Sequence, residues 1–594
     1  MEHKYIAGYP RPQFVRDAWL SLDGAWSFRF DDDKEGLAQQ WYNALPQSQT
    51  ITVPFTYETK ASGIGDERPH SCLWYERSFI VPEPYHNQRV ILNFQAVDYK
   101  TTVWINGKMA GEHEGGYAAF SFDITNYVVL DQENRVTVQV EDDLSRTQPR
   151  GKQRWISDNF GCWYVQTTGI WQSVWLEFVA PAYVEKVRMT PDIDTSTIAF
   201  DYMLKGLGNY APHSLQLDIN IWLRGKLVQQ FKHLTEERFS YSYDLTSPQA
   251  GEWQIALWHP EHPNLYDVEL ILRHGDTVLD HVYTYFGMRK ISTYEGNVLL
   301  NNVPIEQRLI LDQGYWTDTH LTPPSEQALI EDIDKTLAMG FNGVRKHQKL
   351  EDPRYMYWCD RKGVLLWSEM ASTYEFNEQA VTAFTKQWLE IVEQHYNHPC
   401  IVTWVPFNES WGISNILTSR KQQQFTEAIY HLTKSIDDTR LVIVNDGWEH
   451  TVSDIITLHD YEELGEAFSA RYTDKEAVLS NTISFNKHKF AFAQGYNYKG
   501  QPIMISEYGG IAFNSEKGWG YGNQVASEQQ FLERYNSITQ AIKQTPYVSG
   551  YCYTQITDVQ QEVNGLLKEN REPKIDMEIV KAINLGQYDN KPED

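Results

Sequence analysis

The chain has 594 residues, too many for one hydrophobic core, so three or four domains are expected. Its net charge of −27 at pH 7 argues against partners that need clustered lysine and arginine, namely nucleic acid and anionic membrane surfaces. No apolar run approaches the length of a bilayer span, so no membrane partner is expected.

Residues 1–180 show short runs of alternating apolar and polar residues, separated by turn residues. Examples are Ala25–Phe30, Thr101–Ile105 and Arg135–Val140. Asn106-Gly107 follows the second of these runs, and Asn-Gly between two alternating runs is a strong hairpin signal. This region is therefore predicted to be an all-β sandwich of the jelly-roll type.

Residues 181–287 continue the strand pattern over a shorter length. Alternating or apolar runs cover Val184–Met189, Leu215–Leu223 and Tyr266–Leu272. A second, smaller β-sandwich of immunoglobulin type fits this length and pattern.

Residues 288–594 change to an alternation of strand and helix signals. Helical periodicity covers Ser325–Met339, Pro353–Lys362, Ala380–His395, Lys421–Ile436 and Ser527–Lys543, and strand-like runs cover Val364–Ser368, Ile401–Phe407, Leu441–Asn445 and Gly550–Thr554. Alternation over about 300 residues favours a (β/α)₈ TIM barrel.

The five cysteines, Cys72, Cys162, Cys359, Cys400 and Cys552, are scattered without paired spacing. An odd, dispersed set is typical of reduced thiols. The N-terminus has no basic segment followed by an apolar one, as a secretory signal would. Together these features predict a cytoplasmic location.

Two glutamates lie at the ends of strand-like runs in the third region. Glu409 closes residues 404–409, and Glu507 lies near the end of residues 502–509. Each follows an apolar segment typical of a buried parallel strand, and the carboxyl ends of barrel strands are where such folds do their chemistry. Two carboxylates so placed can cleave a glycosidic bond. The alternative is that each is an ordinary surface loop residue.

Other chemistry leaves no comparable signal. There is no metal-ligand cluster, phosphate loop or dinucleotide fingerprint, so neither a metal nor a cofactor is predicted. Aromatic residues are abundant at 14%, with 20 Trp and 36 Tyr. They would suit sugar stacking, although packing in β-sandwich cores accounts for many of them.

Several motifs, in this order along the chain, resemble those of glycoside hydrolase family 2, which includes β-galactosidases, β-glucuronidases and β-mannosidases. They are Leu22–Phe28, Trp104–Gly107, Gly115–Phe120, Thr168–Gln172, Pro263–Tyr266 and Phe286–Arg289. The resemblance covers about residues 10 to 580. It implies the same three domains and a carbohydrate substrate.

The resemblance also implies roles for individual residues. Asn408-Glu409 matches the pair that carries the family's acid/base, and Glu507 in Ser-Glu-Tyr-Gly matches its nucleophile. A retaining double displacement would then place the two carboxyl groups roughly 5–5.5 Å apart. Asn408 would hold the sugar 2-hydroxyl, and Tyr461 resembles the tyrosine that touches the nucleophile, with simple aromatic packing as its alternative.

Other candidate substrate contacts lie where the chain departs from the family pattern. Arg345 is retained and would keep a neighbouring carboxylate ionised. The family's histidine is either shifted by one place, to His347, or replaced by Gln348. Asp312 stands where many relatives carry Arg-His-Glu, and it could bind sugar hydroxyls or cap a turn. Trp411 and Trp519, in loops near the glutamates, could form a subsite wall or pack within their loops.

The glycone is less well defined than the reaction. Asn564 matches part of an Asn-x-Lys uronate motif, but no lysine follows two residues later and Glu562 would repel a uronate, although Lys568 leaves a glucuronide open. An exo-acting β-galactosidase is the leading prediction. β-Mannosidase, β-glucuronidase and α-L-arabinopyranosidase are the alternatives within the family. A catalytically inactive carbohydrate-binding protein is the alternative outside it. Relatives are often dimers or tetramers, which leaves a homo-oligomer open.

Overall fold

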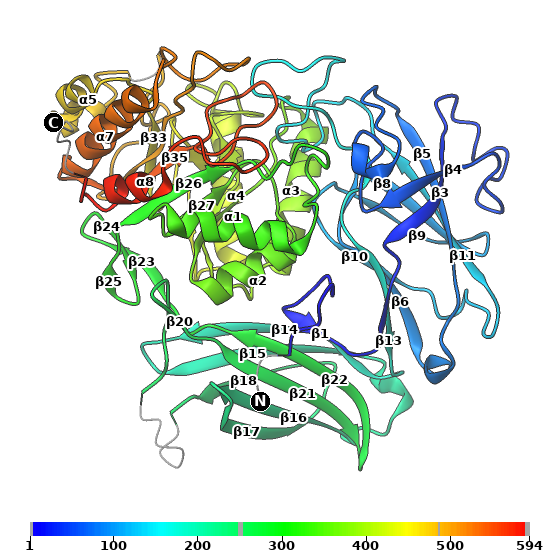
Figure 1. Ribbon diagram of the computed structural model, residues 1–594. Helices are drawn as coiled ribbons and strands as arrows, with labels where there is room; N and C mark the ends of the chain where they lie inside the picture. Colours follow the sequence, from blue (N-terminus) through cyan, green and yellow to red (C-terminus); the bar gives the residue numbers. More distant parts are fainter. Residues whose placement is uncertain (1–3, 247–253, 485–487, 589–594) are drawn as a thin grey trace.

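The computed structural model describes residues 4–246, 254–484 and 488–588. Figure 1 shows two β-sandwiches and a barrel, in chain order, as the sequence predicts: the jelly roll in blue and cyan, the second sandwich below it, and the barrel in green to red. No helix within this part of the chain combines the length and the apolar character needed to cross a bilayer.

The jelly roll packs a six-stranded antiparallel sheet, ordered β4-β3-β5-β11-β8-β9, against a four-stranded sheet, ordered β10-β6-β13-β2. Its strands are β2 (Trp19–Ser21), β3 (Gly24–Phe30), β4 (Gln49–Val53), β5 (Cys72–Phe79), β6 (Arg89–Phe94), β7 (Val97–Asp98), β8 (Lys100–Ile105), β9 (Lys108–Glu114), β10 (Phe120–Asp123), β11 (Asn134–Glu141), β12 (Gly169–Ile170) and β13 (Val174–Val179). The predicted hairpin joins β8 to β9, because Asn106 and Gly107 both adopt the positive φ that such a two-residue turn requires.

The second sandwich packs a three-stranded sheet, β14-β15-β18, against a five-stranded sheet, β1-β22-β21-β16-β17. Its strands are β1 (Phe14–Val15), β14 (Tyr183–Asp192), β15 (Thr197–Lys205), β16 (Leu215–Leu223), β17 (Lys226–Leu234), β18 (Arg238–Asp244), β21 (Tyr266–His274) and β22 (Thr277–Phe286). The N-terminal strand β1 pairs with β22, so a segment before the jelly roll completes the sheet of the second sandwich.

Eight parallel strands form the barrel sheet, in the order β31-β29-β28-β27-β26-β35-β34-β33. They are β26 (Gln307–Asp312), β27 (Gly343–Lys346), β28 (Leu365–Glu369), β29 (Ile401–Val405), β31 (Leu441–Val442), β33 (Ile456–His459), β34 (Ile503–Gly509) and β35 (Val548–Thr554). Every residue of β28, β29 and β34 is buried, as expected for strands covered on both faces.

The helices that surround the sheet are α1 (Glu326–Ala338), α2 (Pro353–Lys362), α3 (Glu378–Gln394), α4 (Arg420–Ile436), α5 (Gly465–Tyr472), α6 (Lys475–Leu479), α7 (Glu528–Gln544) and α8 (Met577–Asn584). Local chemistry sets where several begin. The side chains of Ser325, Asn377 and Ser527 each accept a hydrogen bond from a backbone N–H of the first turn that follows. Such caps stabilise a helix by about 1 kcal/mol each.

The remaining strands are short and lie outside the main sheets. They are β19 (Trp258–His259), β20 (His262–Pro263), β23 (Ile291–Tyr294), β24 (Asn297–Leu300), β25 (Val303–Pro304), β30 (Phe407–Asn408) and β32 (Asn445–Asp446). The parallel pair β30 and β32 matters most for the site, because it continues the chain beyond the carboxyl ends of β29 and β31.

The loop between β11 and β12 connects the jelly roll to the barrel, and we call it the 142–168 loop. The N–H of Arg150 donates to the carbonyl of Ser372 at 3.0 Å, and the hydroxyl of Tyr374 donates to the carbonyl of Gly151 at 2.5 Å. The N–H of Tyr374 donates to the carbonyl of Arg146 at 2.8 Å. The jelly roll is thus joined to the barrel loop that follows β28.

Candidate active site

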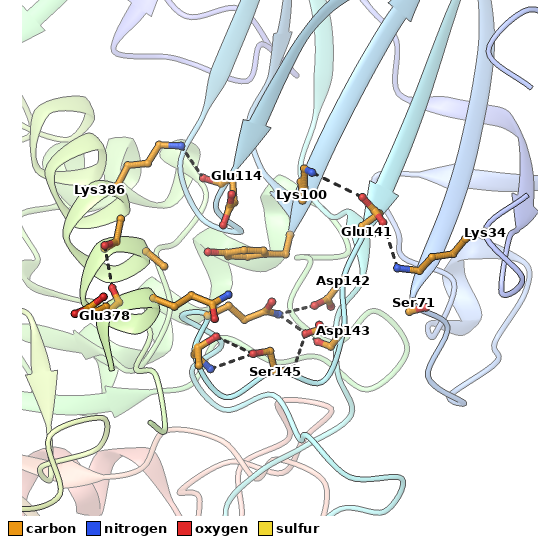
Figure 2. Close-up of a pocket in the computed structure, with 16 residues that line it drawn as sticks. Lys34, Ser71, Lys100, Glu114, Glu141, Asp142, Asp143, Ser145, Glu378 and Lys386 are labelled. Carbon is orange, nitrogen blue, oxygen red and sulfur yellow. Dashed lines mark hydrogen bonds and ion pairs between the residues drawn. The ribbon is translucent and has the colours of Figure 1, made fainter. Parts of the chain in front are cut away.

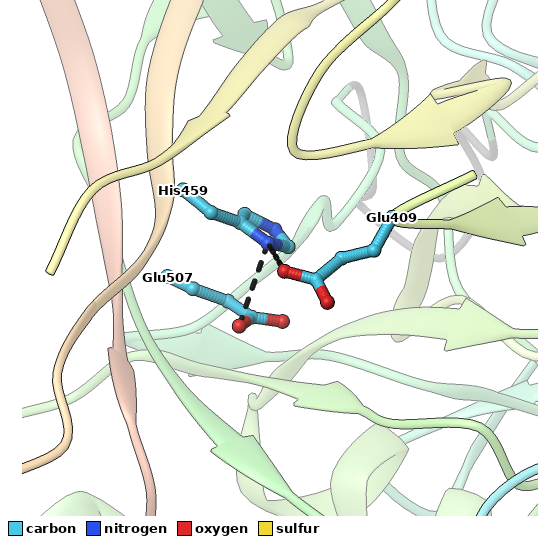
Figure 3. Close-up of side chains that lie close together, drawn as sticks. All are labelled: Glu409, His459 and Glu507. Atoms are coloured by element: carbon cyan, nitrogen blue, oxygen red, sulfur yellow. Dashed lines mark hydrogen bonds and ion pairs between the residues drawn. The ribbon is translucent and has the colours of Figure 1, made fainter. Parts of the chain in front are cut away.

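Glu409 and Glu507 lie close together at the carboxyl ends of barrel strands. Glu507 is part of β34, and Glu409 directly follows β30. One oxygen of each carboxylate and a ring nitrogen of His459, at the end of β33, all lie within 4.8 Å of one another (Figure 3). Three strand ends that are distant in sequence thus meet at one acidic cluster.

His459 links the two glutamates. Its Nδ1 lies 2.8 Å from Oε1 of Glu409 and 3.4 Å from Oε2 of Glu507 (Figure 3). Its Nε2 lies 2.8 Å from Oδ2 of Asp446. Burial lowers the pKa of His459, but the carboxylates of Glu507 and Asp446 outweigh it and raise the pKa to about 10. The imidazolium therefore donates from both ring nitrogens at neutral pH.

Arg345, on β27, is the second cation of the cluster and is fully buried. Its guanidinium donates to Glu507 at 2.7 Å and to Glu369 at 2.9 Å, and it lies 2.9 Å from Asp446. It also donates to Oδ1 of Asn408 at 2.6 Å. A planar fork with five donors can hold several acceptors in fixed directions, so Arg345 orients the cluster.

Glu507 is held in its ionised form. Burial raises its pKa, but His459 and Arg345 outweigh this effect and leave the pKa below its usual value. The hydroxyl of Tyr461 also donates to Oε2 of Glu507, as expected from the sequence, while its ring stacks on Tyr521 at 3.4 Å between centroids. An ionised, oriented carboxylate is what a nucleophile requires.

Glu409 differs from Glu507 in exposure and backbone. Its side chain is 18% exposed, and both Glu409 and Ser410 have positive φ, of 50° and 62°. Residues other than glycine rarely adopt this conformation, and it concentrates at functional sites. The bond from the N–H of Glu409 to the carbonyl of Asp446, at 2.9 Å, holds the turn in place.

The side-chain amide nitrogen of Asn408, which carries two N–H groups, is unpaired among the described residues. Oδ1 of Asn408 accepts from Arg345, while Nδ2 is buried and has no hydrogen-bond partner among the residues that the structure describes. An unpaired buried amide is costly unless a ligand satisfies it. The predicted contact with a sugar hydroxyl would supply that partner.

Aromatic side chains from two domains surround the acidic cluster. The ring of Trp411 lies 6.1 Å from that of His347, 5.9 Å from that of Tyr374, and 5.6 Å from that of Trp163 in the 142–168 loop. Burial, followed by the charges of Lys152 and Arg345, holds the pKa of His347 well below its usual range, so the ring is neutral.

Trp519 is a second contact between the barrel and the 142–168 loop of the jelly roll. Its Nε1 donates to the carbonyl of Gly161 at 2.9 Å, and its ring meets that of Tyr521 edge-on at 5.4 Å. Because Tyr521 stacks on Tyr461, Trp519 lies two rings away from the nucleophile candidate. These contacts fit a wall built jointly by the two domains.

Asp312 does not join the cluster in the way the substrate-binding prediction requires. It is 0% exposed, its Oδ2 accepts from Lys346 at 2.6 Å, and its Oδ1 accepts from the N–H of Gly314 at 2.7 Å. Lys346 is also paired with Glu351 at 2.8 Å. The contacts of Asp312 are those expected from the turn-capping alternative, because both carboxylate oxygens are engaged inside the protein.

Three further cluster members were missed by sequence reasoning. They are His459, Asp446 and Glu369. A local signal existed for each, since His459 and Glu369 end the barrel strands β33 and β28 and Asp446 ends β32. Nothing in the local sequence shows, however, that these ends converge on Arg345.

The trio of Glu409, His459 and Glu507 also has the spacing of metal ligands. A protonated imidazole offers no lone pair to a cation, and the buried Arg345 beside Glu507 would repel one. The donor set therefore fits a proton-transfer pair better than a metal centre.

A separate cavity of about 560 Å³ lies between the jelly roll and helix α3 (Figure 2). Charged residues of both signs line it, among them Lys100, Glu141, Glu378 and Lys386. It contains neither Glu409 nor Glu507, so it is distinct from the acidic cluster.

Three family models match the chain in succession. "Glycosyl hydrolases family 2, sugar binding domain" matches residues 19–179, "Glycosyl hydrolases family 2" matches residues 182–289, and "Glycosyl hydrolases family 2, TIM barrel domain" matches residues 324–586. The three matched ranges follow the order of the two sandwiches and the barrel, and the third begins after the first barrel strand, β26.

Curated proteins and solved structures agree with these models. The chain is 24% identical to a β-glucuronidase of Chlorocebus aethiops, over 95% of this chain and 91% of the relative. It is 26% identical to a β-galactosidase of Thermoanaerobacter pseudethanolicus, over 90% of this chain and 65% of the relative. A β-glucuronidase of Bifidobacterium dentium complexed with coumarin-3-O-glucuronide is similar in fold, with a TM-score of 0.78 and 20% identity, covering 96% of this chain and 98% of that one.

Proposed function

Because the chain belongs to glycosyl hydrolase family 2 and is a β-glycosidase, we propose that it is a retaining, exo-acting β-glucuronidase. The observation that carries the reaction type is the cluster of Glu507, Glu409 and His459 at the barrel strand ends. The glycone rests on the similarity to β-glucuronidases over nearly the whole chain.

Glu507 is the nucleophile in this proposal. One of its oxygens attacks the anomeric carbon as the glycosidic C–O bond breaks, while Glu409 gives its proton to the departing oxygen. The resulting glycosyl ester is opened by water, whose proton returns to Glu409. Oxygens within 4.8 Å of each other suit this double displacement, because inverting enzymes need roughly 6.5–9.5 Å to admit a water between the carboxyl groups.

His459 and Arg345 set the charge of the pair. Together they keep Glu507 ionised before attack, and the charge on Glu507 is lost when the ester forms. The contact between Nδ1 of His459 and Oε1 of Glu409, at 2.8 Å, holds the Glu409 carboxyl group in position for both steps. The same imidazolium thus serves both half-reactions without changing place.

The walls of the site support the exo mode of this proposal. The 142–168 loop contributes Trp163 beside Trp411, and Trp519 is hydrogen-bonded to Gly161 of the same loop. Loops of two domains that meet around the cluster suit a terminal sugar better than the middle of a polysaccharide chain.

β-Galactosidase is the second candidate, favoured by the loop that follows β35. Asn564 donates to Glu562 at 3.1 Å, so a carboxylate lies where a uronate-binding motif would carry neutral or basic groups. A carboxylate there could accept bonds from galactose hydroxyls. The β-galactosidase among the relatives is consistent with this alternative.

Initial rates on 4-nitrophenyl glycosides separate the candidates. The panel is β-glucuronide, β-galactoside, β-glucoside, β-mannoside, β-xyloside and α-L-arabinopyranoside, with the Glu507→Ala protein as blank. We expect the highest kcat/KM on the β-glucuronide. If kcat/KM is highest on the β-galactoside, β-galactosidase replaces β-glucuronidase as the proposed function. If the folded protein hydrolyses none of the six substrates, a carbohydrate-binding protein is favoured.

A further inference from the structure

We propose that Lys152, carried by the jelly roll's 142–168 loop, binds the carboxylate of the substrate's glycone at the barrel's active site. This inference rests on the proposed β-glucuronidase function and assigns its specificity to a residue outside the barrel. It starts from a cation that is buried beside the acidic cluster and has no ion-pair partner among the residues that the structure describes.

Lys152 is 5% exposed. Within the described part of the chain, no carboxylate oxygen lies within 4.0 Å of its Nζ, which instead sits 5.0 Å from the ring centroid of Trp411 and 6.0 Å from that of Tyr164. Buried lysines are normally paired or lose their charge. Among the described residues, the recorded contacts of this ammonium are with aromatic rings and with the thiol of Cys162, so no carboxylate competes for it at ion-pair distance.

Lys152 keeps its positive charge close to the acidic cluster. Burial lowers its pKa, but interactions with Cys162, Glu562 and Glu507 outweigh this and leave the pKa above its usual value. Nζ of Lys152 lies 5.0 Å from the ring centroid of Trp411, whose ring lies 6.1 Å from that of His347, and Nδ1 of His347 lies 3.2 Å from the guanidinium of Arg345. The ammonium thus lies on the same side of the barrel as the nucleophile candidate, and the charge of Glu507 is one of the causes that raise its pKa.

The backbone holds Lys152 firmly. Its carbonyl accepts the N–H of Tyr164 at 2.8 Å, and the N–H of Arg154 donates to the carbonyl of Tyr164 at 2.8 Å. The preceding Gly151 presses against the barrel so closely that a Cβ there would lie 2.3 Å from the carbonyl oxygen of Gln348. A cation on a fixed backbone is positioned before substrate arrives, which lowers the entropic cost of binding.

The barrel's own lysines near this region are already engaged. Lys346 pairs with Asp312 and Glu351, and Lys349 pairs with Glu351 at 3.0 Å. Lys568, which the sequence left open as a uronate ligand, is 52% exposed and pairs with Glu572 at 3.0 Å on the surface. Among the described residues, these three barrel lysines are thus already paired with carboxylates, whereas Lys152 of the jelly roll has no ion pair.

Glu562 is the feature that opposes an anionic glycone. Its Oε2 accepts the hydroxyl of Tyr164, and its Oε1 accepts the amide of Asn564 at 3.1 Å. Both oxygens are therefore bound by protein donors, one of them from the same jelly-roll loop as Lys152. Together with the nearby ammonium, these donors reduce the repulsion that Glu562 would exert on a uronate.

The test compares two substrates that differ only at C6, which is a carboxylate in the glucuronide and a neutral hydroxymethyl group in the glucoside. On 4-nitrophenyl β-glucuronide, Lys152→Met should lower kcat/KM by about 10²-fold, the scale of a lost charge-assisted hydrogen bond. On 4-nitrophenyl β-glucoside, kcat/KM should change by no more than about threefold. Lys152→Arg should keep most of the preference for the glucuronide, because the charge remains. Lys568→Met is the matched control and should leave the ratio of the two substrates unchanged.

The possible outcomes separate the inference from the function it rests on. A wild-type protein that cleaves the β-glucuronide, with a ratio unaltered in Lys152→Met, overturns the role of Lys152 alone. An equal loss on both substrates has the same meaning, since it marks a structural role. A wild-type protein without β-glucuronidase activity overturns the proposed function and this inference together. Inhibition by free sugars gives a test that does not depend on turnover of the glycone. The inference is supported if Lys152→Met raises the Ki of D-glucuronate while the Ki of D-glucose stays constant.

Discussion

Arg345 organises the acidic cluster through contacts that reach four side chains at once. It touches Glu507, Glu369, Asp446 and Asn408 while it is fully buried itself. Each acceptor comes from a different strand end, so the guanidinium fixes the mutual geometry of the strands at the site. Lysine, with one compact ammonium, could not hold four directions.

Glu507→Ala should abolish turnover. Without the carboxylate, neither the glycosyl ester nor its stabilisation can form, so kcat should fall on the order of 10⁴-fold. Steady-state rates on the best substrate of the panel, with circular dichroism to confirm folding, measure this. Activity near that of the wild type would rule out Glu507 as the nucleophile.

Glu409→Ala should affect substrates according to their leaving groups. Protonation of the departing oxygen matters most for poor leaving groups, so alkyl glycosides should lose about 10²–10⁴-fold in kcat/KM and activated aryl glycosides much less. Rates on a series of aryl and alkyl glycosides check this. A uniform loss across the series would contradict the acid role.

Because of His459, the stability of the protein should decrease as the pH rises into the alkaline range. Its pKa is about 10 in the folded protein and about 6.5 when unfolded, so its stabilising contribution is complete below about pH 6.5. That contribution decreases as pH rises and is lost above about 10. The difference in Tm between the wild type and His459→Gln should therefore shrink from pH 6.5 to 10. A difference that stays constant or grows would contradict this assignment.

At the scale of elements, strand ends and loops decide what the site contains. The short strands β30 and β32 extend the barrel sheet and carry Asn408 and Asp446 to the cluster. The turn after β30 has positive φ at Glu409 and Ser410, which directs the acid/base candidate toward His459. Helices and strands could be predicted from periodicity and caps, whereas this turn has no comparable sequence signal.

Gly151→Ala should displace the 142–168 loop. A Cβ at Gly151 would lie 2.3 Å from the carbonyl oxygen of Gln348, and its φ of 60° disfavours any side chain. We expect a loss of about 1–3 kcal/mol in stability and a fall in kcat/KM. Gly275→Ala is the control, because Gly275 has a similar φ of 57° but nothing within 4 Å of its Cβ position. Equal effects of the two substitutions would show that the close approach does not matter.

At the scale of the whole molecule, the jelly roll and the barrel behave as one unit at the site. Helix α3 contacts the jelly roll through Gln387, whose Oε1 accepts the N–H of Tyr117 at 2.9 Å in a buried position. The same helix reaches Ala119 through Gln394, at an exposed position. The wall of the active site depends on this junction, because the 142–168 loop belongs to the jelly roll.

Gln387→Ala should destabilise the protein by about 1–3 kcal/mol, because the buried N–H of Tyr117 loses its acceptor. Gln394→Ala should have a much smaller effect, since water can replace the lost bonds of Ala119. Thermal unfolding of the two variants makes the comparison. A larger effect of Gln394→Ala would contradict the importance of the buried contact.

The sequence by itself determined the three-part architecture and the two glutamates, because both follow from local patterns. Alternating residues predict sandwich strands, and 3.6-residue periodicity with caps predicts barrel helices. An acidic residue after a buried strand stands out against its neighbours. Only the tertiary structure decided which strand ends share Arg345, and that Asp312 is paired with Lys346 inside the protein. It also brought Lys152 to a site on another domain. Side chains distant in sequence meet through packing, and no local periodicity encodes which of them become neighbours.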